Sequence, residues 1–154
     1  MITPRILFTA VGLLIAGIYA SSLALAADQA RPCYRGYAAA DVAAKLQGKV
    51  AELEKRFGVG DAPEKITPPT FKEVPRPFSI DLRRGRSRLS IAVFAVIDPQ
   101  GKTLECVILD ASDEVVAKEA GAIMCAAKYA PARMGKKAVQ SAAIFEIEGA
   151  GIPK

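Results

Sequence analysis

The sequence predicts an α+β domain, in which a small three-stranded antiparallel sheet carries one packed helix and is preceded by an N-terminal amphipathic helix. The first observation is a pair of runs rich in Val, Ile, Leu and Phe, at residues 90–97 and 103–109. Between them lies DPQGK, in which Pro99 fixes one turn angle and Gly101 can take a positive φ. These two runs are therefore predicted to form a β-hairpin.

The second and third observations follow the hairpin and give the chain order strand, strand, helix, strand. Residues 112–128 open with a serine and two acids, which are typical of a helix N-terminus. Apolar residues then recur at helical spacing, which predicts a packed helix. They are Val116, Ala120, Ile123, Met124 and Ala127. Residues 144–148 are Ile, Phe, Glu, Ile and Glu, and the alternation of apolar and acidic side chains from Phe145 onward predicts the last strand.

The amphipathic helix is expected over residues 38–57. Its apolar positions are three or four residues apart, and charged residues occupy the rest of the helical wheel. Two interpretations remain open, because such a face can pack on its own domain or form a short coiled-coil contact with a partner. The apolar positions are Val42, Leu46, Val50, Leu53 and Phe57.

A proline-rich segment separates this helix from the sheet. Residues 58–79 contain five prolines, too many for a helix or a central strand, so an extended linker is predicted. The expected organisation is a helical segment at 28–57, a linker at 58–79 and a terminal domain at 80–150.

The first 27 residues have the pattern of an export signal. Residues 6–27 carry no charge, Arg5 precedes them, and Ala24, Leu25 and Ala26 form a small-x-small site. We therefore expect a signal peptide, cleaved after Ala26 or Ala27, and a protein located in the periplasm. The alternative is an uncleaved anchor in the inner membrane, since this apolar stretch is long enough to span a bilayer.

Residues 77–148 resemble the C-terminal domain of TonB-type energy transducers. The resemblance rests on DPQGKTLECVILDAS, on KYAPARMGKKAV and on the terminal FEIE, in that order. One departure is Ala127, where the family often has Trp. The resemblance implies a non-enzymatic module whose last strand pairs with a protein partner in the cell envelope, such as a segment of an outer-membrane receptor. The implied partner-binding edge is Ser141, Ala142, Ala143, Ile144, Phe145, Glu146 and Ile147.

Two features argue against a working energy transducer. The family's anchor carries a histidine needed for coupling to its motor partners, and this chain has no histidine. A linker of this length would span only about 60 Å when fully extended, which is short for a periplasm. We therefore expect an exported protein that uses the TonB-like fold for recognition, in envelope upkeep or an accessory transport complex. A membrane-anchored, divergent transducer is the alternative.

A second alternative is binding to an anionic surface. Four arginines lie within six positions and could contact lipid head groups or acidic polymers. The net charge of +5 is a mild excess, and no motif typical of nucleic-acid binding is present, so nucleic acid is not an expected partner. The four residues are Arg83, Arg84, Arg86 and Arg88.

The reactive residues favour a disulfide over catalysis. Without histidine the chain lacks the usual general base and metal ligand, and no motif indicates a catalytic residue, a metal site or a cofactor. On a helical wheel Cys125 falls about 180° from Val116, which points it away from the sheet, whereas Cys106 shares the core face of its strand. A bond between Cys33 and Cys125 is therefore predicted, with a Cys106–Cys125 bond as the main competitor.

Overall fold

The computed structural model describes residues 31–86 and 88–150. All of them except Arg31 belong to one compact unit that begins at Pro32. The predicted signal peptide or anchor, residues 1–27, lies outside the described residues.

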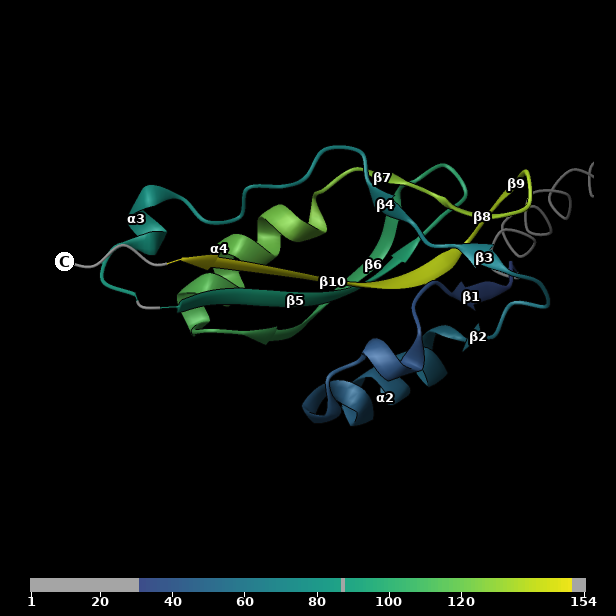
Figure 1. The fold of residues 1–154 in the computed structure, drawn as a ribbon, viewed down its shortest axis with the longest axis horizontal. Helices are drawn as coiled ribbons and strands as arrows, with labels where there is room; N and C mark the ends of the chain where they lie inside the picture. Colours follow the sequence, from purple (N-terminus) through teal and green to yellow (C-terminus); the bar gives the residue numbers. More distant parts are fainter. Residues whose placement is uncertain (1–30, 87, 151–154) are drawn as a thin grey trace, which may run out of the picture. The chain divides into compact units, whose positions relative to one another are not determined.

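The predicted three-stranded antiparallel sheet is present and forms part of a larger sheet. Strands β5 (Arg88–Ile97), β6 (Thr103–Ala111) and β10 (Ser141–Ala150) are antiparallel, with β5 in the middle. Two short parallel strands extend it beyond β10, β1 (Cys33–Arg35) and then β2 (Val59–Gly60). The five strands have the order β2-β1-β10-β5-β6 (Figure 1). The prediction was thus right for the central part and missed the two strands from the N-terminal half.

The turn between β5 and β6 confirms the predicted hairpin. The Asp98 carboxylate accepts hydrogen bonds from the backbone N–H groups of Gln100 and Lys102 at 2.9 and 2.8 Å. Gly101 has φ of 84°, a conformation that residues with a Cβ rarely adopt. The turn residues therefore set the register of β6 against β5.

Helix α4 (Glu114–Cys125) covers one face of the sheet. Its N-cap is Asp113, whose carboxylate accepts from the N–H of Val116 at 2.8 Å. The helix buries Val116, Ala120, Gly121 and Met124 against the side chains of Leu89, Ile91 and Val93 of β5. Ile123, predicted to be in the core, is 42% exposed, because the helix packs through Gly121 instead.

Helix α2 (Gln47–Phe57) covers the opposite face, after two short 3₁₀ turns, η1 (Ala39–Asp41) and η2 (Ala44–Leu46). Its buried residues Val50 and Leu53 pack with Phe94 of β5, and Phe57 stacks on the Phe94 ring at 6.1 Å between centroids. The amphipathic helix thus packs on its own domain, and the sheet lies between two helices (Figure 1).

The segment predicted as a linker, residues 58–79, is extended but joined to the domain. It contains β3 (Ile66–Thr67), paired with β8 (Ala132–Met134), and β4 (Thr70–Phe71), paired with β7 (Tyr129–Ala130). Strand β9 (Lys137–Val139) forms a hairpin with β8, and the short helix α3 (Ile80–Arg83) leads into β5. The prolines exclude a helix here, and the residues between them form the short strand pairs.

Candidate functional site

The last strand is paired along its whole length on one side only. Every residue of β10 pairs with β5, but on the other side β1 pairs only with Ser141 and Ala142. Within residues 31–86 and 88–150 no strand lies beside residues 144–150 on that side. The N-terminal end of the predicted edge is therefore occupied, and the rest is open.

The hydrogen bonds of β1 show which peptide groups point to the open side. The carbonyl oxygens of Gln140 and Ala142 accept from the N–H groups of Tyr34 and Gly36, at 3.1 and 2.8 Å. In an antiparallel strand the direction of the peptide groups alternates from residue to residue, so even-numbered residues of β10 face outward and odd-numbered ones face β5. The open edge consequently offers the N–H and C=O groups of Ile144, Glu146 and Glu148.

A groove of about 780 Å³ lies next to this edge. Ile144 and Glu146 line one side of it, and the end of β1 with the turn that follows lines another. The third side is the chain between β2 and β4, including Asp61, Glu64 and Lys65. The groove thus lies where β1 leaves β10, and it extends along the open edge as far as Glu146.

An ion-pair network holds the end of β1 at this groove. The Arg35 guanidinium donates to the Glu54 carboxylate from Nε at 2.6 Å and from Nη2 at 3.1 Å, and also pairs with Asp61. The Tyr37 hydroxyl donates to Glu54 at 2.7 Å. The hydrogen bond from Arg35 lowers the pKa of Glu54, while burial and the Glu54 carboxylate raise the pKa of Tyr37. Glu54 is therefore charged and Tyr37 neutral at neutral pH.

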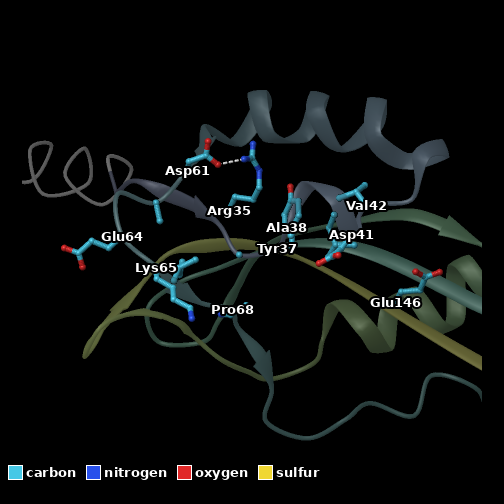
Figure 2. Close-up of a pocket in the computed structure, with 14 residues that line it drawn as sticks. Arg35, Tyr37, Ala38, Asp41, Val42, Asp61, Glu64, Lys65, Pro68 and Glu146 are labelled. Carbon is cyan, nitrogen blue, oxygen red and sulfur yellow. Dashed lines mark hydrogen bonds and ion pairs between the residues drawn. The ribbon is translucent and has the colours of Figure 1, made fainter.

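The remaining charges make the groove acidic. Its lining includes the carboxylates of Asp41, Asp61, Glu64 and Glu146, against the cations of Arg35 and Lys65. Figure 2 shows Glu64 on one side of the groove and Asp41 and Glu146 on the other. Four carboxylates against two cations leave the lining of the groove with an excess of negative charge.

The predicted arginine patch is not a single free surface. Arg86 donates to Asp113 at 2.6 Å and to the Leu82 carbonyl at 2.7 Å, so it ties α3 to the start of α4. Arg88 pairs with Glu148 at 3.1 Å on the neighbouring strand β10. Two of the four arginines therefore have structural ion pairs, and the other two, Arg83 and Arg84, remain in and after α3.

The predicted bond between Cys33 and Cys125 is wrong, because Cys125 is bonded to Cys106 and Cys33 is a buried free thiol. The prediction took the direction of Val116 as the core face of the helix, which placed Cys125 on the opposite side. In the structure Gly121 also belongs to the buried face of α4. The helix is therefore rotated about its axis toward β6, and Cys125 lies beside Cys106. The Cα atoms of the bonded pair are 5.6 Å apart, a usual distance for a disulfide.

Sequence reasoning missed the groove, because its walls come from segments far apart in the chain. Arg35 lies before the predicted amphipathic helix, Glu54 lies on that helix, and Asp61 lies in the predicted linker. Among the described residues no group of His, Cys, Asp and Glu is arranged to hold a metal ion. In the same part of the chain, no helix is long and apolar enough to cross a membrane.

The fold and this site define a class: a sheet domain packed between two helices, with an open strand edge beside an acidic groove. No protein-family model matches the chain, and no curated protein matches it either.

Proposed function

We propose that this protein is an exported, non-enzymatic binding module of the TonB C-terminal type, which takes a partner segment as an added strand beside β10. The observation that carries the proposal is the row of outward peptide groups at Ile144, Glu146 and Glu148, with a groove of about 780 Å³ beside the first two of them. Main-chain hydrogen bonds would supply the affinity, as in other complexes formed by strand addition.

The arrangement of the terminal domain supports the family assignment. The hairpin of β5 and β6, helix α4 and strand β10 follow one another in the chain order that the resemblance implies. Tyr129, the aromatic residue of the KYAPARMGKKAV segment, is fully buried, and its hydroxyl donates to the Met124 carbonyl at 3.1 Å. The ring thereby closes the end of α4 against the sheet without the Trp common in the family.

We place the module in the periplasm, with cleavage near Ala26, and the anchored transducer remains the alternative. The N-terminal residue of the protein purified from envelope fractions distinguishes them. Ala27 or Asp28 at the N-terminus supports a free exported module, and Met1 supports the anchor. This measurement is independent of strand addition.

Strand addition is tested with a synthetic peptide, STVQVTS with blocked ends, and amide hydrogen exchange measured by NMR. Saturating peptide should slow exchange at the outward amides of Ile144, Glu146 and Glu148. The amides of Phe145 and Ile147 already bond to β5, so their exchange should change little and they serve as an internal control. Unchanged exchange at all three outward amides would overturn strand addition at β10.

A matched pair of variants separates the backbone contribution from that of the side chain. Glu146→Pro removes one outward N–H, and proline is tolerated at an edge position whose N–H faces solvent. Glu146→Ala keeps this N–H. The proline variant should bind the STVQVTS peptide more weakly than the alanine variant, and slow exchange at Phe145 and Ile147 confirms that β10 is intact in both. Equal binding would count against the proposal.

A further inference from the structure

The open edge of β10 has two faces of opposite character. Glu146 is paired in register with Ala92 of β5, on the side of the sheet that α2 covers. Phe145 and Ile147 lie on the side of α4. Side chains alternate in a strand, so an added strand would also place its side chains alternately on these two faces.

On the α2 side the guest would meet an unpaired carboxylate. Glu146 is exposed, and it makes no ion pair with any residue among 31–86 and 88–150. Glu148, two residues on, differs because Arg88 pairs with it. Asp41 lines the same groove as Glu146 and adds a second negative charge to the groove (Figure 2). The chain as a whole carries a net charge of +5, so the charge of this groove is opposite in sign to that of the whole chain.

On the α4 side the guest would meet aromatic and aliphatic groups. The Phe145 ring packs on Phe71 and Tyr129, with centroids 4.5 and 4.8 Å apart, yet Phe145 is only partly buried. Ile147 is partly buried too. Apolar cross-strand neighbours would cover these side chains and remove them from water.

Resting on the strand addition proposed above, we infer that the partner is an extended segment with a lysine or arginine flanked on both sides by apolar residues. The basic residue lies opposite Glu146 and reaches into the acidic groove. The two apolar residues lie against Phe145 and Ile147. The edge therefore selects its guest by alternating charge and hydrophobicity in addition to main-chain pairing.

The inference is tested with three blocked peptides, STVKVTS, STVQVTS and STVEVTS, titrated into the folded chain at low and high salt. A cross-strand charge pair is worth about a two- to fivefold change in affinity. The lysine peptide should bind that much more tightly than the glutamine peptide, and the glutamate peptide more weakly. The differences should shrink at high salt, because exposed charges are screened.

A charge reversal then identifies the residue responsible. Glu146→Lys should invert the order of the three peptides. Glu105→Lys is the matched control, since it makes the same change of net charge on β6, the other edge of the sheet, and should leave the order unchanged. An inverted order with Glu105→Lys would place the guest on β6 and overturn the inference.

The remaining outcomes separate this inference from the proposed function. If all three peptides bind equally well and slow the outward amides of β10, strand addition stands and selection of a basic residue is wrong. If none of the peptides slows exchange at these amides, both strand addition and the selection of a basic residue are wrong. If the outward amides are slow without peptide and the chain elutes as a dimer, a second copy occupies the edge, and the inference is overturned.

Discussion

The backbone N–H of Gly36 donates to the carbonyl oxygen of Ala142 over 2.8 Å, and there β1 ends and the chain turns away from β10. This bond sets the start of the open edge, because the next outward-facing residue, Ile144, has no strand beside it. A larger residue at position 36 does not fit. A Cβ there would lie 2.7 Å from the Ala142 oxygen and 2.9 Å from Cδ of Pro69.

We therefore predict that Gly36→Ala lowers the free energy of unfolding by about 1 to 3 kcal/mol, a usual cost of overpacking. The control is Gly60→Ala in β2, where a Cβ would meet nothing within 4 Å. Urea unfolding of both variants provides the comparison. Equal stability of the two would mean that β1 does not pack tightly at Gly36.

The two helices contain glycines with opposite expected effects. In α4 a Cβ at Gly121 would come within 2.5 Å of Cδ1 of Ile108, so this side chain must shift. Gly121→Ala should therefore destabilise the fold by up to about 2 kcal/mol, the cost of overpacking less the gain in helix propensity. In α2 a Cβ at Gly48 would meet nothing, and Gly48→Ala should stabilise by up to about 1 kcal/mol through helix propensity. Thermal unfolding distinguishes these signs, and a stable Gly121→Ala variant would contradict the close packing of α4 on β6.

Local patterns explain what could be predicted of the fold. The hairpin depends on Asp98 and Gly101, which are close in sequence, and α4 on an apolar period within one segment, so both were found. The additional strands β1 and β2 have three and two residues, too few to show alternation. Their position depends on pairing with distant β10, which no local pattern encodes.

The site was predicted only in part for the same reason. The predicted partner-binding edge was residues 141–147, and no strand pairs with residues 144–147 on their outer side within the described part of the chain. Partner binding at these residues stays a prediction. Ser141 and Ala142 are covered by β1, and the groove depends on Arg35 meeting Glu54 and Asp61, nineteen and twenty-six positions away. A long-range ion pair leaves no periodic signal in the sequence. The predicted disulfide pairing was wrong because α4 is rotated about its axis, and the absence of a side chain at Gly121 allows this rotation.

The ion pair between Arg35 and Glu54 predicts a pH-dependent stability. Arg35 lowers the pKa of Glu54 in the folded state, so the stabilisation is complete above the unfolded value of about 4.3 and is lost as pH falls through the folded pKa. Glu54→Gln should cost about 1 to 3 kcal/mol at pH 7, as expected for a hydrogen bond to a charged group. The difference from the unmodified protein should shrink below about pH 4.

Glu52→Gln is the control for this experiment, because Glu52 is exposed on the same helix. Chemical unfolding at pH 7, 5 and 3 gives the three points needed. A constant difference between Glu54→Gln and the unmodified protein at all three values would contradict a charged Glu54 in the network.

The disulfide between Cys106 and Cys125 predicts the labelling pattern and the effect of reductant. Alkylation of the unfolded, non-reduced protein should modify Cys33 alone, and mass mapping of the peptides checks this. In the folded protein Cys33 should react slowly, because it is buried and burial raises the pKa of its thiol.

The disulfide joins residues nineteen positions apart, so reduction should lower the free energy of unfolding by about 3 kcal/mol. The stability of the double variant Cys106→Ala with Cys125→Ala should not change with reductant, whereas that of Cys33→Ala should fall as in the unmodified protein. In the alkylation experiment, a labelled Cys106 would instead indicate the Cys33–Cys125 pairing.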